Sequence, residues 1–291
     1  MFPHFNNDMQ KPNTSHIKSF QYLENGDVKT HIFETIKSSK TLDPGFYHLS
    51  YNVMDKEIIL KSTTCNELLQ VYNFTNKELI DKAFESFFSN AVKMKMQSLG
   101  ILHKLGILFH GIEGTGKSTI IKHYAQRLIN EHNGIVIYFN EKTNILETWQ
   151  FVEDLRKIQT TPIMVIFEEI DLNLSGYNNC EGSLKRIFDG DKSIDNCLFM
   201  ASTNYFDRIP DAIKNRSSRF KYVLNIENIQ CLETIKSLVT HFIGDLFDKN
   251  KIEDFSVDLM GETLDNIKHF CIDKIMTLQK FPKKEEKKIG F

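Results

Sequence analysis

The amino-acid sequence predicts an α/β fold with a mostly parallel sheet, and three observations support this prediction. Between residues 106 and 226, short apolar runs alternate with helical stretches. A glycine-rich motif follows the first of these runs, and two carboxylates follow the third. Strands separated by helices of this length form parallel sheets with helices on both faces. In chain order, the predicted strands are GILFHG, IVIYF, IMVIF, CLFMAS and YVLNI.

The regions on either side of this core have different patterns. Residues 1–76 contain the β-like runs HIFETI, GFYHLSYNV and EIILKS, with a turn signal at Pro44-Gly45, and predict a small β-containing N-terminal domain. Apolar residues recur at helical spacing from Lys77 onward, so we expect the core over residues 77–227. Two further helical stripes predict a small helical lid over residues 228–280, and residues 281–291 are expected to be a charged, flexible tail.

Composition excludes several classes of protein. The formal net charge of -2 argues against strong, sequence-independent binding to nucleic acid, which needs a positive surface. No apolar run approaches the roughly 18 residues that span a bilayer, and the N-terminus has no apolar signal core. The five cysteines show neither a metal-binding nor a disulfide spacing. We therefore expect a protein of the reduced cytoplasm that does not contact membranes.

The glycine-rich motif carries the strongest chemical signal. Residues 111–118 read GIEGTGKS and fit the phosphate-binding pattern GxxxxGK[ST] between a strand and a helix. The glycines let backbone N–H groups surround a phosphate, and the next helix points its N-terminus at the same anion. The Lys117 ammonium should reach the β- and γ-phosphates of ATP, and the Ser118 hydroxyl should bind Mg²⁺. The predicted nucleotide-binding residues are Gly111, Gly114, Thr115, Gly116, Lys117, Ser118 and Thr119.

Two carboxylates follow the predicted strand IMVIF. One acid at such a strand end can hold Mg²⁺, directly or through water, and a second can polarise the attacking water. We assign the metal role to Glu168 and the general-base role to Glu169. Asp is the usual residue at the first position, so the extra methylene of Glu168 changes the geometry while keeping a hard oxygen ligand.

Five motifs, occurring together and in order, make the chain resemble the classical AAA branch of the AAA+ ATPases. They are KLGILFHGIEGTGKST, IFEEID, SLKRIFDG, FMASTN and IPDAIKNRSSRF. The matching stretch runs from about residue 106 to residue 226 and leaves the N-terminal hundred residues uncovered. The resemblance implies a five-stranded parallel sheet in the order 5-1-4-3-2, hydrolysis of ATP with Mg²⁺, and assembly into a homo-oligomeric ring, expected to be a hexamer.

The resemblance also implies roles for three residues outside the two motifs above. Asn204 is similar to the family's sensor 1, which hydrogen-bonds the γ-phosphate or the lytic water. Arg216 and Arg219 resemble arginine fingers, which reach a neighbour's γ-phosphate. No arginine follows Arg219, so the chain lacks the lid arginine called sensor 2, as is typical of the classical branch. The stretch GETLDNIK resembles the start of that branch's lid helix.

The sequence does not identify the substrate. Threading machines of the family carry an aromatic pore loop after the second strand, where this chain reads NEKTNILETWQFVEDL. Trp149 shares helical spacing with Ile145 and Val152, so we expect it in the core rather than in a pore. Three functions are left: an ATPase that remodels a protein or protein complex recognised by residues 1–76, a nucleic-acid-associated ATPase such as a clamp-loader-like or helicase-loading factor, and a nucleotide-regulated scaffold. The net charge and the absent lid arginine favour the first.

Overall fold

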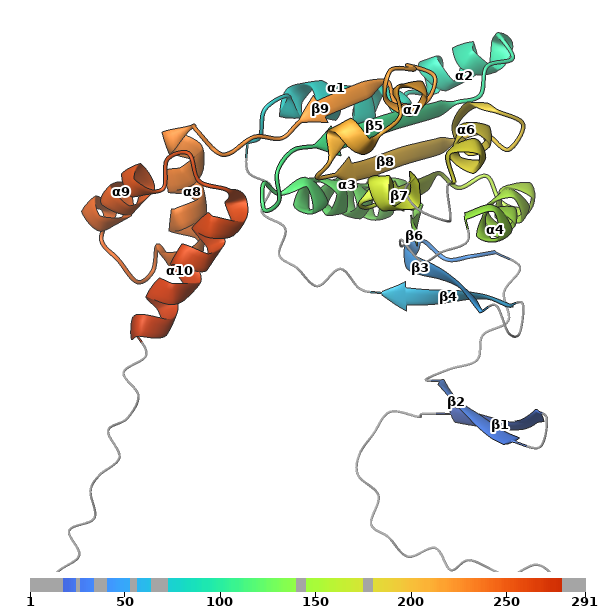
Figure 1. The fold of residues 1–291 in the computed structure, drawn as a ribbon, viewed down its shortest axis with the longest axis horizontal. Helices are drawn as coiled ribbons and strands as arrows, with labels where there is room; N and C mark the ends of the chain where they lie inside the picture. Colours follow the sequence, from blue (N-terminus) through green and yellow to red (C-terminus); the bar gives the residue numbers. More distant parts are fainter. Residues whose placement is uncertain are drawn as a thin grey trace, which may run out of the picture. The chain divides into compact units, whose positions relative to one another are not determined.

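The computed structural model describes residues 18–24, 27–33, 41–52, 57–63, 73–139, 145–174 and 180–278. The chain divides into two compact units, Met1–Leu42 and Asp43–Phe291. In the first unit, the strands β1 (Lys18–Glu24) and β2 (Asp27–Phe33) pair in antiparallel orientation (Figure 1). The second unit holds a mixed sheet, the helices around it and a separate group of helices.

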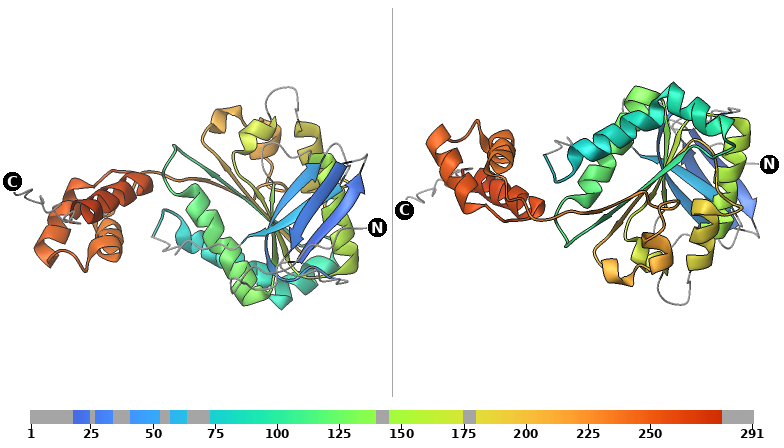
Figure 2. Two further views of the ribbon diagram at one scale, coloured as in Figure 1. Left: turned by 90° about the horizontal axis from the view of Figure 1, so that it is seen from below. Right: turned by 90° about the horizontal axis from the view of Figure 1, so that it is seen from above.

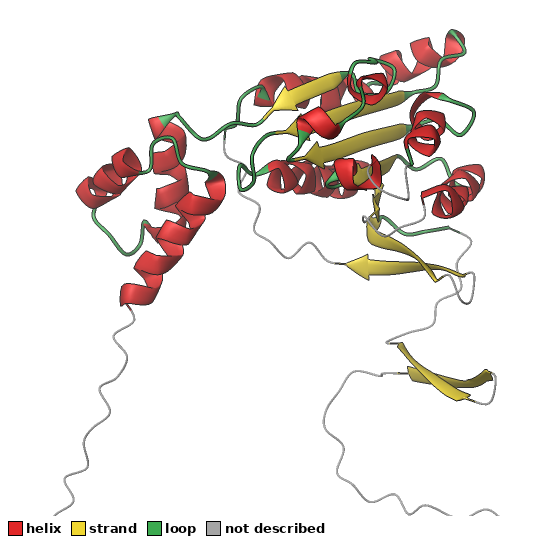
Figure 3. Ribbon diagram, in the orientation of Figure 1, coloured by secondary structure: helices red, strands yellow, loops and turns green. Residues whose placement is uncertain are grey.

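The sheet of the second unit has seven strands in the order β4-β3-β6-β7-β8-β5-β9. Figure 3 draws strands in yellow and helices in red. All neighbouring strands are parallel except β3 and β4, which are antiparallel. The strands are β3 (Gly45–Asn52), β4 (Glu57–Thr63), β5 (Lys104–His110), β6 (Ile135–Phe139), β7 (Ile163–Phe167), β8 (Cys197–Thr203) and β9 (Tyr222–Asn225).

The predicted α/β class is confirmed, and the predicted number of strands is corrected. Strands β9, β5, β8, β7 and β6 lie side by side, which reproduces the expected order 5-1-4-3-2. The sheet has seven strands rather than five because β3 pairs with the outer edge of β6 and β4 pairs with β3. An unpaired β6 would expose a row of backbone N–H and C=O groups, and β3 satisfies them. Residues 45–63, which the sequence placed in the N-terminal domain, are therefore part of the core sheet.

Helices cover both faces of this sheet (Figure 2). On one face, Ile80 and Phe84 of α1 (Lys77–Phe88) and Tyr124 of α3 (Lys117–His132) join a buried cluster with the strands. The following helix α2 spans Asn90–Ser98. On the other face, α4 (Ile145–Ile158) and α6 (Glu181–Asp189) contribute the aromatic rings of Trp149 and Phe188. Three short helices complete the core: α5 (Ile170–Leu174), the 3₁₀ helix η2 (Phe206–Arg208) and α7 (Asp211–Lys214).

The expected core position of Trp149 is confirmed. The residue is 1% exposed, and its ring stacks on Phe199 with the ring centres 6.1 Å apart. Its Nε1 donates a hydrogen bond of 2.8 Å to the carbonyl oxygen of Lys192. Residues 140–144, the first part of the pore-loop region, lie outside the described residues.

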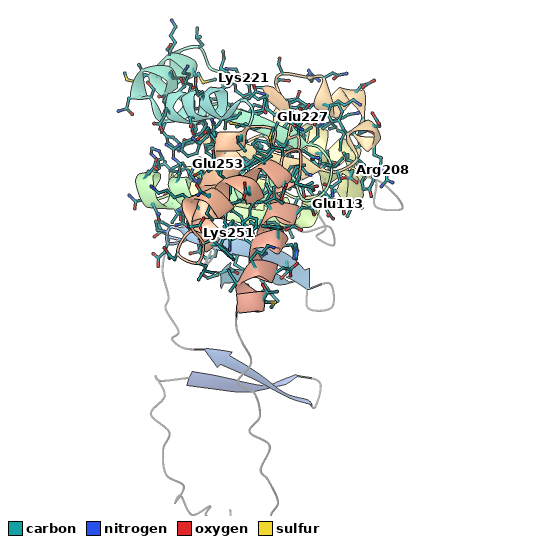
Figure 4. All side chains as sticks on the ribbon, turned by 90° about the vertical axis from the view of Figure 1, so that its left-hand side faces the viewer. Glu113, Arg208, Lys221, Glu227, Lys251 and Glu253 are labelled. Atoms are coloured by element: carbon teal, nitrogen blue, oxygen red, sulfur yellow. The ribbon has the colours of Figure 1, made fainter. Side chains whose placement is uncertain are left out.

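Three helices occupy the stretch in which the apolar stripes predict a lid, and we call this group the lid. They are α8 (Leu232–Ile243), α9 (Lys249–Asp258) and α10 (Leu264–Leu278), and α8 packs against both others. Lys236 of α8 and Glu253 of α9 form an ion pair of 3.3 Å across two of these helices; Glu253 is labelled in Figure 4. The predicted tail, residues 281–291, lies outside the described residues. Among the helices of the described ranges, none is long and apolar enough to cross a membrane.

Candidate functional site

The glycine-rich loop connects β5 to α3 in a conformation that other residues would strain. Gly111, Gly114 and Gly116 have φ angles of 143°, 76° and 97°, in the region that favours glycine. A Cβ atom at Gly111 would lie 2.2 Å from the carbonyl oxygen of Ile226, which is closer than real atoms approach. The loop therefore needs glycine for its backbone angles. At Gly111 it also needs glycine because Ile226, the residue after β9, approaches so closely.

Lys117 is the first residue of α3, and its side chain folds back over the loop. Its Nζ donates hydrogen bonds of 2.8 Å and 2.6 Å to the carbonyl oxygens of Gly111 and Ile112. The residue is 7% exposed, and this burial lowers the pKa of the ammonium while the carboxylates of Glu113 and Glu169 act in the opposite direction. The site thus holds a desolvated cation at a helix N-terminus, which is an environment that binds anions.

A cleft of about 780 Å³ opens beside this loop. Predicted site residues that line it are Gly114, Gly116, Lys117, Ser118, Thr119, Glu168, Glu169 and Asn204. Sequence reasoning did not single out the other lining residues, Glu113, Tyr138, Ser202, Thr203, Leu264, Asp265 and Lys268. Thr115 is fully buried and donates a hydrogen bond of 3.0 Å to Ile112 O, so it braces the loop from behind.

The two carboxylates after β7 have different surroundings. Glu168 is half-buried, and its Oε2 accepts a hydrogen bond of 2.8 Å from Tyr138 Oη. Glu169 is exposed, and its backbone has a φ of 48°. This left-handed conformation costs a non-glycine residue about 1–3 kcal/mol. The strained turn ends β7 and starts α5 at the next residue, so it fixes the direction in which Glu169 leaves the strand.

A buried carboxylate connects α5 to the end of β8. Asp171 is 1% exposed, and its Oδ1 accepts a hydrogen bond of 2.6 Å from Thr203 Oγ1. The same hydroxyl oxygen accepts a hydrogen bond of 2.9 Å from the backbone N of Tyr205. These contacts hold the backbone on both sides of Asn204, whose Nδ2 lies 3.5 Å from Glu113 Oε1. Asp171 is the last residue of the motif IFEEID, so the sequence did contain a signal for this support.

The two arginines lie outside the cleft and differ strongly in exposure. The side chain of Arg216 is 61% exposed and that of Arg219 is 5% exposed, and both form ion pairs with Asp189, at 3.1 Å and 3.0 Å. Arg219 also donates to Ala212 O, and Ser218 donates to Asp189. Burial raises the pKa of the Asp189 carboxyl, but the hydrogen bonds from Ser218 and Arg219 and the positive charges outweigh it, so the pKa lies below its ordinary value. In this conformation Arg219 is a bonded part of the fold and only Arg216 faces outward.

The lid touches the glycine-rich loop directly. Asp265 N donates a hydrogen bond of 3.0 Å to Gly114 O, and a Cβ atom at Gly114 would meet the Asp265 and Thr263 side chains at 3.1 Å and 3.2 Å. Thr263 Oγ1 accepts a hydrogen bond of 3.1 Å from Asn266 N at the start of α10. Lys268 of the same helix lines the cleft and gives the lid a cation there.

The oxygen atoms in the cleft suit Mg²⁺. Ser118, Glu168 and Glu169 line it together, and hydroxyl and carboxylate oxygens are the hard ligands that this cation prefers. Mg²⁺ is commonly held by one or two carboxylates together with substrate phosphates rather than by a cage of side chains. Within the described ranges, no group of three or more His, Cys, Asp and Glu side chains could hold a metal by itself.

Comparison with known proteins agrees with this geometry. Residues 107–228 match the model of the family described as "ATPase family associated with various cellular activities (AAA)". A Plasmodium falciparum (isolate 3D7) protein named "Putative cell division cycle ATPase" is 32% identical over 143 residues. That alignment covers 44% of this chain and 11% of the relative's length. The glycine-rich loop and the acids after β7 lie in the matched region, and the two comparisons together with the strand order 5-1-4-3-2 support the AAA+ ATPase superfamily.

Proposed function

We propose that the protein binds ATP together with Mg²⁺ in this cleft and hydrolyses it. The observation that carries the proposal is the convergence of Lys117 and the two carboxylates after β7 on one cleft beside a helix N-terminus. Such an arrangement combines phosphate binding with the activation of water, and the two together make a hydrolase. The relative's name, which describes an ATPase, supports the same activity.

Binding begins with an exchange of hydrogen-bond partners at Lys117. Its Nζ donates to the carbonyl oxygens of Gly111 and Ile112, and phosphate oxygens compete well for these protons because charge-assisted bonds are the stronger ones. Backbone N–H groups of the glycine-rich loop and the first turn of α3 surround the same phosphates. The positive φ angles of its glycines suit a backbone that curves around an anion.

The chemical step then uses side chains at the ends of β7 and β8. Glu169 accepts the proton of the water that attacks the γ-phosphate, and Asn204 orients that water. Ser118 and Glu168 would hold the cation, and bound Mg²⁺ would supply positive charge that neutralises the phosphate oxygens. The support around Asn204, from Asp171 through Thr203, keeps its amide in place during turnover.

The proposal includes a homo-oligomeric ring, with a hexamer as the expected form. Arg216 would contact the γ-phosphate in the neighbouring subunit, and its 61% exposed side chain supports this role. Arg219 would act indirectly, since its guanidinium is bonded to Asp189 and Ala212 O. A cytoplasmic location is also part of the proposal, supported by the buried free thiols of Cys197 and Cys271.

We propose remodelling of a protein or protein complex as the work that hydrolysis drives, with residues 1–76 recognising the partner. The test is the stimulation of ATP turnover in the full chain by unfolded protein, by DNA and by RNA. Stimulation by unfolded protein alone supports the proposal, and stimulation by nucleic acid alone replaces it with the nucleic-acid-associated function. Turnover close to zero with tight ATP binding identifies a nucleotide-regulated scaffold.

The nucleotide-binding part is tested separately by calorimetry with ATP and Mg²⁺. Lys117→Ala is expected to abolish tight binding, because the loop loses its only side-chain cation. Lys157→Ala is the control, since that lysine is 70% exposed on α4 and does not line the cleft. Unchanged affinity in Lys117→Ala would show that the glycine-rich loop does not bind ATP.

A further inference from the structure

Glu168 differs from the usual aspartate by one methylene, and its side chain accepts a hydrogen bond from the neighbouring strand β6. Tyr138 Oη donates a hydrogen bond of 2.8 Å to Glu168 Oε2. Tyr138 belongs to β6 and lies opposite Ile166 of β7 in the sheet register. Since side chains alternate along a strand, Glu168, two residues after Ile166, projects from the same face as Tyr138. Glu168 follows the last residue of β7, and its long side chain reaches the Tyr138 hydroxyl from there.

The tyrosine ring is itself fixed by a strand that the family's five-stranded sheet does not contain. In the parallel pairing of β3 and β6, His48 lies opposite Tyr138, and the two ring centres are 4.8 Å apart. Phe46, on the same face of β3, lies 6.3 Å from the tyrosine ring. Tyr138 also lines the cleft with Ser118. Packing of the Tyr138 ring against β3 therefore holds its hydroxyl at the wall of the cleft.

We propose that Tyr138 is a positioning residue that orients the Glu168 carboxylate for Mg²⁺ binding. The tyrosine engages one carboxylate oxygen, Oε2, and the other, Oε1, would bind the cation directly or through a water molecule. Hydrogen bonds of this kind fix the orientation of a metal ligand, and their loss typically weakens metal affinity about 10–100-fold. The inference rests on the proposed function, because it assigns Glu168 to the Mg²⁺ of a bound nucleotide.

The test is the Mg²⁺ dependence of nucleotide binding in the full chain with Tyr138→Phe, which removes the hydroxyl and keeps the ring. A fluorescent ADP analogue is titrated in EDTA and then at increasing Mg²⁺ concentrations. The affinity in EDTA is expected to stay within about twofold of wild type, while the Mg²⁺ concentration that gives half of the affinity gain rises about tenfold. Tyr47→Phe is the matched control, because the Tyr47 hydroxyl donates to Asp43 O at 2.9 Å and does not line the cleft.

A double-mutant cycle with Glu168→Gln identifies the partner through which the tyrosine acts. Glu168→Gln alone should raise the half-effective Mg²⁺ concentration at least as much as Tyr138→Phe, and adding Tyr138→Phe to it should change that value by less than about twofold. In the Glu168→Asp background, whose carboxylate is one methylene shorter, the effect of Tyr138→Phe should also shrink. If Tyr138→Phe raised the half-effective Mg²⁺ concentration as much in the Glu168→Gln background as in the wild type, the inference would be overturned.

The remaining outcomes separate this inference from the proposed function. If Glu168→Gln raises the Mg²⁺ requirement and Tyr138→Phe does not, the positioning role is wrong and the proposed function stands. If Tyr138→Phe weakens binding equally in EDTA and in Mg²⁺, the tyrosine supports the fold rather than the ligand, and the inference is again wrong. If neither change alters the Mg²⁺ requirement, the metal role of Glu168 in the proposed function fails as well.

Discussion

The two ends of the central strands carry charged clusters that are organised in opposite ways. At the carboxyl end of β5, Lys117 and the acids after β7 line an open cleft of about 780 Å³. Near the amino end of β5, Gly106 lies against the backbone of Arg219, and Asp189 forms ion pairs with Arg216 and Arg219. The first cluster faces a space that an anion can enter, whereas in the second both arginines are paired with the same carboxylate.

This difference bears on how the arginines can act. Gly106 lies four residues before the carboxyl end of β5, so at roughly 3.3 Å per residue about 13 Å of strand separates it from that end. Neither Arg216 nor Arg219 lines the cleft of its own chain. In the proposed ring a finger would act on a second copy of the chain, and of the two arginines Arg216 has the exposed side chain.

The largest expected effect follows from this separation. Arg216→Ala should lower ATP turnover about 10³-fold, which lies within the range for arginine fingers, and should leave nucleotide affinity unchanged. Turnover is measured in a coupled assay and affinity by calorimetry. Mixing the variant with Lys117→Ala subunits should restore part of the activity, because some intact arginines then face intact clefts.

A cis role would give different results in the same experiment. Mixed subunits would recover no activity, and the wild-type protein would be fully active at concentrations where light scattering shows only monomer. Either result would remove Arg216 from the ring mechanism.

The second prediction concerns the cleft. Glu169→Gln should bind ATP and hydrolyse it at least about a hundredfold more slowly, because a general base typically contributes 10²–10⁴ and the amide cannot accept the proton. Single-turnover hydrolysis with excess enzyme measures this. If Glu168→Gln gave the ATP-bound, inactive state and Glu169→Gln stayed near wild type, the two roles would have to be exchanged.

The third prediction concerns the cluster at the amino ends. Arg219→Ala should lower the free energy of unfolding by about 3 kcal/mol, because it leaves the Asp189 carboxylate without a buried partner. Denaturant titration measures the change. Arg186→Ala is the matched control: it removes an arginine of α6 whose side chain is 49% exposed and which forms an ion pair with Asp191, two residues after the helix ends. Equal effects of the two variants would show that burial does not distinguish these pairs.

The smallest expected effect is a pH dependence of stability from His103, the residue before β5. This side chain is 4% exposed, and its Nε2 lies 2.6 Å from Phe87 O, to which it donates. Burial lowers the pKa of the imidazole, partly offset by the hydrogen bond to Phe87 and the charge of Asp195. A histidine with a lowered pKa in the folded state contributes stability above its unfolded pKa of about 6.5, and that stability is lost as the pH falls below it.

Thermal unfolding between pH 8 and pH 5.5 checks this sign. The midpoint of the wild type should fall as the pH decreases through this window, and the fall should be smaller in His103→Gln. Burial also lowers the pKa values of His48, His110, His123 and His132, so the pH dependence should be reduced rather than abolished. His269→Gln, at a side chain that is 71% exposed, should follow the wild type. A steeper fall in His103→Gln would reverse the assigned sign.

Much of the core and of the cleft could be predicted because its requirements are local. The glycine-rich loop needs glycine at the three positions with positive φ, and these stand at fixed spacing in the chain. The apolar runs predict β5 to β9, and the motif order places Lys117, Glu168, Glu169 and Asn204 at strand ends that meet on one side of a parallel sheet. The spacing of the motifs did not predict the hydrogen-bond partner of Glu168, because that partner, Tyr138, belongs to a different strand, β6.

The tertiary structure alone decided the features that depend on pairing between distant segments. The runs that form β3 and β4 have ordinary strand patterns, and only the unpaired edge of β6 determines that they extend the core sheet. The same pairing sets His48 against Tyr138 and thereby the hydroxyl against Glu168. Arg216 and Arg219 look equivalent in sequence, but burial against Asp189 makes one a part of the fold and leaves the other exposed. Backbone angles are encoded residue by residue, whereas register and burial arise only when segments far apart in the chain come together.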